Sequence, residues 1–268
     1  MKISLFHRLL AVTALAGLFI PSLRAAENAQ PAPTAELAIA AAADLKFAFD
    51  DVVKAFNEKQ PACKVSVTFG SSGNFFTQLQ NGAPFDLFFS ADIQYPQKLA
   101  EDGLTADAIF PYSIGQIVVW VPKNSPIDVK KLGIKALLDP SVSKIAIANP
   151  EHAPYGRAAV AALQTLKVYD QVQPKLVYGE NIAQAAQFVQ SGAADVGILA
   201  LSLAIAPKMA EAGRYWEVPL DAYPKLEQGG VILKSAKNIE GARAFRDFVL
   251  SENGRAILKR YGFFLPEK

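Results

Sequence analysis

Cysteine and histidine are almost absent from this sequence, with one cysteine and two histidines among 268 residues. The single cysteine, Cys63, can form neither an intramolecular disulfide nor a cysteine-rich zinc site. The two histidines, His7 and His152, form no H-E-x-x-H zinc motif, and chemistry that needs a histidine pair is excluded. We expect Cys63 to be a small, partly buried side chain rather than a reactive thiol, because the strand-like residues 65–68 follow it.

An excess of positive charge is also missing. The formal net charge is +2 and no stripe of lysine and arginine is present, which argues against nucleic-acid binding. The nucleotide-binding motifs G-x-x-x-x-G-K-[ST] and G-x-G-x-x-G are absent, and so is the G-x-S-x-G elbow of hydrolases. What the sequence does have is 51% hydrophobic residues, too many for a disordered chain, and a length that suits one or two domains.

The first 26 residues have the layout of a secretory signal peptide. A positive start at Lys2, His7 and Arg8 precedes the apolar stretch 9–20, and small residues at 25–26 offer a cleavage site. The stretch is too short to span a membrane as a helix, and the absence of a nearby cysteine argues against a lipid anchor. Cleavage would remove three basic residues and no acidic one, leaving 24 basic and 25 acidic residues and a net charge of −1. We therefore expect a soluble protein in the periplasm.

After a polar leader over residues 27–35, short apolar strands alternate with amphipathic helices. This alternation predicts an α/β fold in which mostly parallel sheets are flanked by helices, and the length suits two sheets rather than one. The expected strands cover residues 37–42, 65–69, 84–90, 116–121, 144–148, 176–178, 195–199 and 231–233. The expected helices include residues 45–56, 75–79, 155–166 and 182–189 and a terminal helix over 239–261.

Four turns that join a strand to the following helix carry the candidate binding chemistry. They cover residues 42–44, 70–73, 151–156 and 179–182. In open α/β sheets, ligands bind at the carboxyl ends of the strands. The N-terminus of a helix has unpaired N–H groups and a partial positive charge, so it attracts anions. Several such ends around one cleft would hold a small anion without any lysine or arginine.

Catalytic alternatives rest on one histidine and a few carboxylates. A Ser–His–Asp triad would need His152, which we interpret as a turn histidine. We expect Asp50 and Asp51 to be solvated on the polar side of their helix. For Asp86 and Asp92 we predict structural roles, as a strand-end contact and a helix cap.

Four segments, at these turns and near the end of the chain, resemble the periplasmic molybdate-binding protein family. The segments are AAAADLKFAFDDVVKAF, FGSSGNFFTQLQNGAPFDLFFSAD, NPEHAPYGRAA and KRYGF. The resemblance implies a type II periplasmic binding protein, whose two lobes, joined by a two-strand hinge, close on one oxyanion. It also implies an ABC transporter, in which molybdate, and tungstate as well, passes to an inner-membrane permease driven by a cytoplasmic ATPase. It implies no enzyme activity and no cofactor, with molybdenum present only as bound molybdate, and we expect a monomer.

The resemblance places the oxyanion site on five residues: Asp44, Ser72, Tyr155, Ile182 and Ala200. In the family, hydroxyls and backbone amides hold the anion without cationic side chains. Ser72 keeps the family's serine, and Tyr155 and Ile182 fall at backbone-amide positions. Two positions depart, because Asp44 stands where the family has a serine and Ala200 where it has a tyrosine. We hypothesise that the Tyr155 hydroxyl replaces the missing tyrosine from the opposite wall.

The carboxylate of Asp44 would repel a dianion, by about 4 kcal/mol for unit charges about 4 Å apart at an effective dielectric constant of roughly 20. Three arrangements relieve this repulsion. Asp44 turns away and caps its own helix, or it is protonated, or a cation such as Lys46 or Arg157 neutralises it. We expect the cap, which leaves the backbone amides of the turn for the ligand.

The strand order predicts one lobe of residues 36–112 plus 231–268 and another of residues 113–230, with hinges near 112–115 and 228–230. Three other functions stay open. The ligand could be another oxyanion or a small organic acid, for which Arg157 is the one candidate clamp near a turn. The protein could be a periplasmic hydrolase that uses His152 or paired carboxylates. It could also be the effector domain of a transcription regulator, although no helix-turn-helix precedes residue 36.

Overall fold

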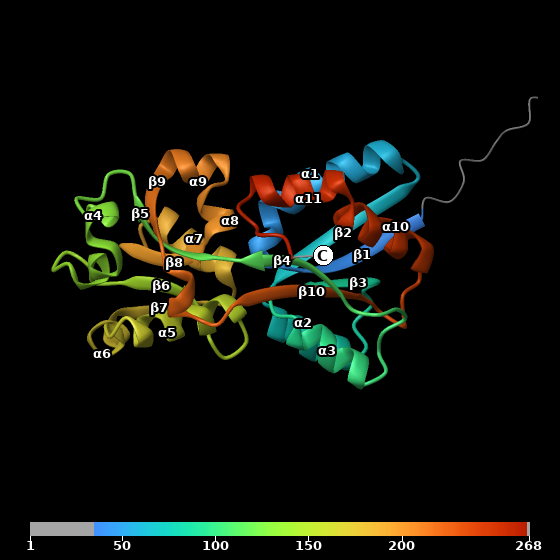
Figure 1. Ribbon diagram of the computed structural model, residues 1–268, viewed down its shortest axis with the longest axis horizontal. Helices are drawn as coiled ribbons and strands as arrows, with labels where there is room; N and C mark the ends of the chain where they lie inside the picture. The colour runs from blue at the N-terminus through green and yellow to red at the C-terminus, as the bar shows by residue number, and fades with distance from the viewer. Residues whose placement is uncertain (1–34, 267–268) are drawn as a thin grey trace, which may run out of the picture. The chain divides into compact units, whose positions relative to one another are not determined.

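Two five-stranded sheets form the framework of the computed structural model, which describes residues 35–266 (Figure 1). The first sheet has the order β2-β1-β3-β10-β4 and the second the order β7-β6-β8-β5-β9. Their strands are β1 (Ala35–Ala42), β2 (Cys63–Gly70), β3 (Leu87–Ser90), β4 (Phe110–Gly115), β5 (Ile117–Pro122), β6 (Ile145–Ala148), β7 (Leu176–Gly179), β8 (Val196–Ala200), β9 (Gly213–Glu217) and β10 (Leu226–Ile232). The predicted signal peptide and residues 27–34 of the leader lie outside the described residues.

The two sheets share one pairing pattern. In each, the strand next to one edge, β1 or β6, is parallel to both of its neighbours. The remaining two pairings, made by β10 or β5, are antiparallel. The predicted α/β fold with two sheets is therefore confirmed. Only half of the pairings in each sheet are parallel, however, so the sheets are mixed where the alternation of strands and helices predicted mostly parallel ones.

Helices cover both faces of the first sheet (Figure 1). On one face lie α1 (Lys46–Lys59), α10 (Ile239–Leu250) and α11 (Glu252–Arg260), and on the other lie α2 (Ser72–Gln80) and α3 (Gln94–Glu101). The alternation of side chains along a strand explains this layering. Ile39 and Ala41 of β1 pack with the α1 residue Phe49, whereas Ala40 packs with the α2 residue Phe75.

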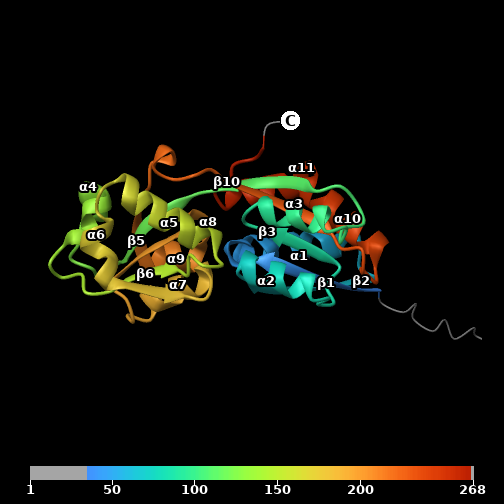
Figure 2. The same cartoon turned by 90° about the horizontal axis from the view of Figure 1, so that it is seen from below.

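The second sheet is covered in the same way. Its α-helices are α4 (Val129–Leu132), α5 (Pro154–Thr165), α6 (Tyr169–Val172), α7 (Ile182–Gln190), α8 (Leu201–Ala204) and α9 (Pro207–Ala212). Short 3-10 helices lie at η1 (Ala43–Leu45), η2 (Gly133–Leu138), η3 (Gln173–Lys175) and η4 (Leu220–Ala222). Figures 1 and 2 show α5 and α6 on one side of the sheet and α7 on the other. Helix α7 begins at Ile182 because the Asn181 side chain caps it, accepting the N–H groups of Ala183 and Gln184.

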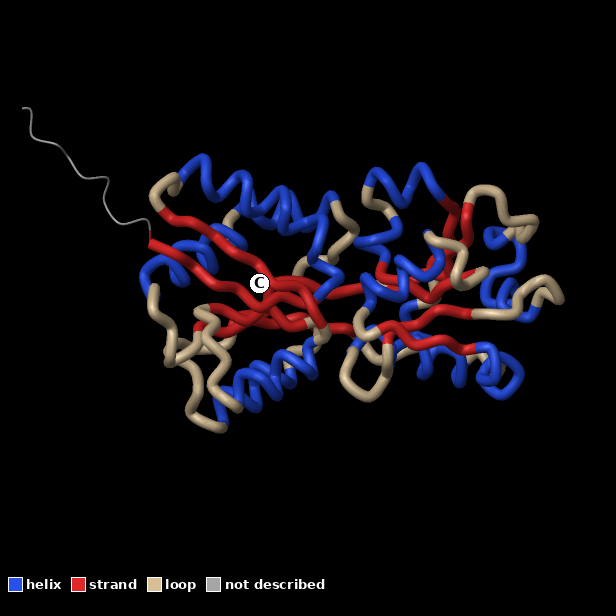
Figure 3. The backbone as a smooth tube through the Cα atoms, turned by 180° about the vertical axis from the view of Figure 1, so that it is seen from behind, coloured by secondary structure: helices blue, strands red, loops and turns tan. Residues whose placement is uncertain are grey.

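Two chain crossings connect the sheets (Figure 3). Strands β4 and β5 belong to different sheets and are separated only by Gln116, while residues 218–225 lead from β9 to β10. The predicted lobe boundaries after residues 112 and 230 and the predicted hinges at 112–115 and 228–230 thus fall inside β4 and β10. Both strands belong wholly to the first sheet, because β10 pairs with β4 from Leu226 to Gly230.

The predicted terminal helix over 239–261 is two helices rather than one. Ser251 has an extended backbone, and its hydroxyl accepts the N–H of Gly254 at the start of α11. Serine competes with helical hydrogen bonds through its own side chain, which favours such a break. The pattern of apolar residues also missed β4, β9, α3 and the short helices α4, α6, α8 and α9. Strand β9 carries arginine and glutamate and is only partly buried, so it lacks the apolar run of a central strand.

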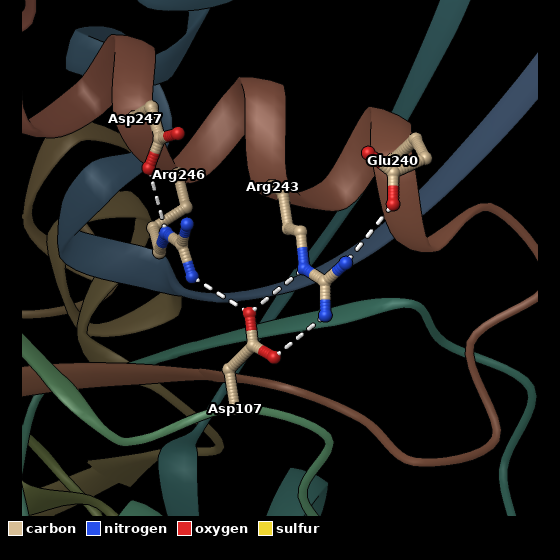
Figure 4. Close-up of polar contacts among 5 residues, drawn as sticks. All are labelled: Asp107, Glu240, Arg243, Arg246 and Asp247. Carbon is tan, nitrogen blue, oxygen red and sulfur yellow. Dashed lines mark hydrogen bonds and ion pairs between the residues drawn. The ribbon is translucent and has the colours of Figure 1, made fainter.

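A cluster of charged side chains fastens the loop after α3 to α10 (Figure 4). The Asp107 carboxylate accepts hydrogen bonds from Arg243 at 2.9 and 3.1 Å and from Arg246 at 2.8 Å. Those two guanidinium groups lower the pKa of Asp107, with the hydrogen bond from Arg243 as the largest cause. Among the helices described here, none has both the length and the apolar character needed to cross a membrane.

Candidate functional site

The four predicted turns meet around one small cavity, which we call the turn cavity. Its wall consists of residues 42–44, 70–72, 91, 153–155 and 181–182. The cavity volume is about 10 Å³, close to the smallest space that accepts one water molecule. Of the five predicted site residues, Asp44, Ser72, Tyr155 and Ile182 line it. Ala200 does not, since it ends β8 and pairs with Ile117.

Three helices direct their first turns at the turn cavity. Ser72, Tyr155 and Ile182 are at the N-terminal ends of α2, α5 and α7. Within residues 35–266, the N–H groups of these three residues make no hydrogen bond. The first N–H groups of a helix have no carbonyl partner in the helix, and the aligned peptide dipoles add a partial positive charge there. The cavity is therefore surrounded by free donors without a formal cation on its wall.

The Ser72 hydroxyl is a further donor. Its side chain is fully buried, and its oxygen accepts the N–H of Ala91 at 2.9 Å. A hydroxyl has one proton to donate and two lone pairs. Because the Ala91 contact uses one lone pair, the Ser72 proton stays available to a ligand.

Asp44 does not cap its helix, so that prediction is wrong. Neither η1 nor α1 has a side-chain hydrogen bond at its N-terminus. Asp44 Oδ2 instead accepts hydrogen bonds from the Tyr155 hydroxyl at 2.9 Å and from Gln228 Nε2 at 2.7 Å. Asp44 Oδ1 is buried and has no hydrogen-bond partner within residues 35–266. Burial raises the pKa of Asp44 to about 6, although the bonds from Gln228 and Tyr155 and the nearby amides of residues 44 and 45 oppose the rise.

Cations do not neutralise Asp44 either. Arg157 binds Asp92 at 2.7 Å and the Tyr95 hydroxyl at 3.1 Å, with its guanidinium over the Tyr95 ring. Lys46 lies over the ring of Phe47. Three arrangements would relieve the repulsion between Asp44 and a dianion. Because Asp44 neither caps its helix nor pairs with a cation, protonation of Asp44 is the remaining one.

Gln228 is a site residue that the sequence analysis did not find. Its amide nitrogen donates to Asp44 Oδ2, and its oxygen accepts the Ser113 hydroxyl proton at 2.7 Å, which fixes the orientation of the amide. Gln228 is fully buried. The only signal in the sequence is a polar residue next to Gly229 and Gly230, inside the segment predicted as a hinge. Ser202, two residues beyond the predicted Ala200, also touches the site, because its hydroxyl donates to the Asp44 carbonyl at 2.8 Å.

His152 links two turns on opposite sides of the turn cavity. Its Nδ1 lies 2.9 Å from the Ser71 hydroxyl, and its Nε2 lies 3.6 Å from Glu180. Its carbonyl accepts the N–H of Gly73 at 2.9 Å. Serine, histidine and glutamate in series resemble a nucleophile relay. Ser71 is nevertheless only 4% exposed, so a substrate carbonyl has no path to it in this arrangement.

Asp86, Asp92 and Cys63 are the residues for which the sequence predicts structural roles. Asp86 accepts the N–H groups of Ala38 and Lys237, each at 2.7 Å, and is the strand-end contact that was predicted. The prediction that Asp92 caps a helix is wrong, because Ile93 is the N-cap of α3 and no side chain caps that helix. Asp92 accepts the N–H of Gln94 with one oxygen and pairs with Arg157 through the other. Cys63 is partly buried against the core of the first sheet. No group of three metal-ligating side chains is present in the described part of the chain.

Comparison with known proteins identifies the family. The family of bacterial extracellular solute-binding proteins matches residues 37–264. The chain is 37% identical over 236 residues to the molybdate-binding protein ModA of Rhodobacter capsulatus, which covers 88% of this chain and 90% of that protein. This chain belongs to the periplasmic molybdate-binding protein family.

Solved structures support the same membership. The periplasmic molybdate-binding protein of Azotobacter vinelandii matches with a TM-score of 0.78 and 31% identity, over 86% of this chain and 100% of that one. A sulfate-binding protein of Mycobacterium tuberculosis has a TM-score of 0.70 at 18% identity, over 85% of this chain and 86% of that one. The second likeness concerns the fold alone. Within the molybdate-binding family, the residues at the turn cavity must therefore decide the ligand.

Proposed function

We propose that this chain is the periplasmic substrate-binding component of an ABC transporter for molybdate, and that it holds the oxyanion in the turn cavity. The observation that carries the proposal is the convergence of four strand-to-helix turns on one cavity whose wall, in the described chain, has no cationic side chain. The names of the relatives support the same ligand, since the Rhodobacter protein is called molybdate-binding.

The donors at the turn cavity suit a tetrahedral dianion. The free amides of Ser72, Tyr155 and Ile182 come from three helices, and the Ser72 hydroxyl adds a fourth donor. Helix N-termini favour anions by both hydrogen bonding and the peptide dipoles. Donors from several directions match the four oxygen corners of a tetrahedral anion better than the flat fork of an arginine, which suits carboxylates.

Binding needs the turns to move apart. A tetrahedral oxyanion has five heavy atoms and does not fit a cavity of about 10 Å³. The turns touch across the cavity mainly through polar contacts that can part, including Gly73 N–H to the His152 carbonyl, Tyr155 to Asp44 and the Arg157–Asp92 ion pair. The two crossings at Gln116 and 218–225 give the sheets a place to pivot, and we propose these as the hinge in place of the predicted positions.

The remaining parts of the proposal follow from this function. Tungstate, a tetrahedral dianion like molybdate, is expected to bind as well, while selectivity against sulfate comes from cavity size because the charge is the same. The partners are an inner-membrane permease and its cytoplasmic ATPase. The chain acts in the periplasm as a monomer after removal of its signal peptide, without a cofactor and without catalysis.

Thermal unfolding with a panel of oxyanions tests the proposal. A ligand at about 1,000 times its dissociation constant stabilises the folded state by about 4 kcal/mol. We expect molybdate and tungstate to raise the unfolding temperature and sulfate and phosphate to leave it unchanged. Ser72→Ala should weaken the molybdate effect, whereas Ser191→Ala, an exposed serine on the far end of α7, should not. A shift with sulfate or phosphate alone would identify a different oxyanion, and no shift with any of the four would refute the function.

A further inference from the structure

Among residues 35–266, Asp44 is the only acidic or basic side chain on the wall of the turn cavity. It is 1% exposed. Its Oδ2 is fully engaged by Tyr155 and Gln228, whereas its buried Oδ1 has no hydrogen-bond partner among residues 35–266. A buried carboxylate oxygen without a partner is an unfavourable arrangement that a structure ordinarily avoids. The lone oxygen therefore points to a group that is absent from the chain itself.

We propose that the oxyanion and one proton bind together, with the proton held on Asp44. The inference rests on the proposed function and adds a second species, a proton, to the same site. The proton comes from solvent and is placed on Oδ1, so Asp44 enters the complex as a neutral carboxylic acid whose O–H can donate to an oxyanion oxygen. Oδ2 keeps accepting from Tyr155 and Gln228, and no covalent bond other than the new O–H is made or broken.

Magnitudes favour this state over an ionised Asp44. Because the pKa of Asp44 is about 6, adding the proton at pH 7 lowers the binding constant about tenfold. An ionised carboxylate about 4 Å from a single negative charge lowers it about a thousandfold at an effective dielectric constant of roughly 20. The dianion carries two such charges. Taking up the proton therefore lowers the binding constant far less than leaving Asp44 ionised beside the oxyanion.

The helices and strands packed around Asp44 carry no positive charge that could offset the repulsion between an ionised Asp44 and the oxyanion. Tyr155 of α5 and Tyr112 of β4 are the titratable groups that face it, and burial, followed by the charge of Asp44, raises the pKa of both phenols. Gln228 of β10 is uncharged. Helices α7 and α8, which pack against η1, carry no titratable residue.

Two basic side chains near this region, Lys46 and His152, have other partners. Burial raises the pKa of Asp50, and the charge of Lys46 at the start of α1 opposes that rise, whereas Lys46 is not among the causes that shift the pKa of Asp44. His152 is the only histidine within residues 35–266, and its Nδ1 lies against the Ser71 hydroxyl. His152 therefore needs its own variant in the test.

Calorimetric titration of the mature protein with molybdate, between about pH 6 and about pH 9 and in buffers of different ionisation enthalpy, measures both affinity and proton uptake. For the wild type we expect uptake of close to one proton per molybdate at about pH 8, and an association constant that falls about tenfold per pH unit above about pH 6. Asp44→Asn and Asp44→Ser should bind with little pH dependence and no proton uptake. Asp50→Asn, which changes an exposed acidic residue of α1, and His152→Gln should keep the wild-type proton uptake.

The outcomes separate the inference from the proposed function. Molybdate binding by the wild type without proton uptake would overturn the inference and leave the function standing. Uptake that survives in Asp44→Asn and disappears in His152→Gln would also overturn it, because the proton would then belong to the imidazole. If the wild type binds no molybdate at any pH, both fail. The wild-type proton count needs no variant, so a poorly folded Asp44 variant does not remove the test.

Discussion

The Tyr155 hydroxyl donates a 2.9 Å hydrogen bond to Asp44 Oδ2, across the turn cavity and over 111 positions of sequence. Asp44 departs from the family pattern at the first turn, and Tyr155 is the residue proposed to compensate for the other departure, at Ala200. The two exceptional side chains thus contact each other. A substitution of either residue should therefore change the surroundings of the other, and the effect of each substitution can be measured.

Tyr155→Phe removes the hydroxyl that Asp44 accepts from. Asp44 is neutral in the proposed complex, and a hydrogen bond between neutral groups contributes about 0.5–1.5 kcal/mol. We therefore expect the dissociation constant for molybdate to rise by roughly twofold to tenfold, measured by calorimetry. Tyr178→Phe, which alters a tyrosine that is 47% exposed, is the matched control. Unchanged affinity in Tyr155→Phe would show that the hydroxyl does not take part in binding.

Asp44→Asn should make the free protein more stable at neutral pH. The folded pKa of about 6 lies above the ordinary value of 3.8, so the folded state holds the proton more tightly than the unfolded state. The contribution of Asp44 is therefore most favourable below about pH 4, and it falls by about 3 kcal/mol as pH rises through about 6. Chemical denaturation at several pH values should show that the free energy of unfolding of the variant increases relative to that of the wild type as pH rises through this range. A constant difference between the two would contradict the raised pKa.

Arg157→Gln distinguishes the oxyanion from an organic acid. Arg157 is occupied by Asp92, and its side chain is 40% exposed, so the pair is worth at most about 1 kcal/mol. We expect molybdate affinity to change by less than about fivefold. A complete loss of binding would show that Arg157 contacts the ligand. It would favour the alternative in which Arg157 binds the carboxylate of a small organic acid.

Gly73→Ala should hinder closure without unfolding either sheet. A Cβ at this position would lie 2.6 Å from the His152 carbonyl oxygen, on the other side of the turn cavity. Overpacking of this kind costs about 1–3 kcal/mol, so molybdate affinity should fall by about tenfold or more. The added Cβ would meet the same carbonyl in the free protein, so the unfolding temperature of the free protein should fall as well. Gln78→Ala, exposed on the same helix, controls for the effect of alanine, and equal affinities for the two variants would rule out the steric explanation.

Asp107→Asn should lower the thermal unfolding temperature by a few degrees at neutral pH. The Arg243 and Arg246 guanidinium groups hold the pKa of Asp107 below its ordinary value. The stabilisation is thus present above about pH 4 and is lost as pH falls through the lowered pKa. Scanning calorimetry should find the gap between wild type and variant narrowing in acid. Molybdate affinity should stay unchanged, because Figure 4 places the cluster on α10 and the loop that holds Asp107.

Local patterns in the sequence determined the elements and the general chemistry. The apolar stripe of α1, with Phe49, Val52 and Phe56 buried, and the stripe of α7 are set by side-chain spacing within one helix. The four turns are recognisable for the same reason, because each is a short run between a strand and a helix. The lack of a basic excess already indicated that an anion would be held by amides and hydroxyls.

Only the tertiary structure decided how these parts meet. The direction of β10, which turns half of the first sheet antiparallel, and the position of the crossings depend on pairing between distant segments. Asp44 is bound by Tyr155 and by Gln228, 111 and 184 positions away, and this is why a cap predicted from its neighbours was wrong. The donors that reach a buried carboxylate are those that the packed chain brings within about 3 Å, and no local pattern records which donors those are.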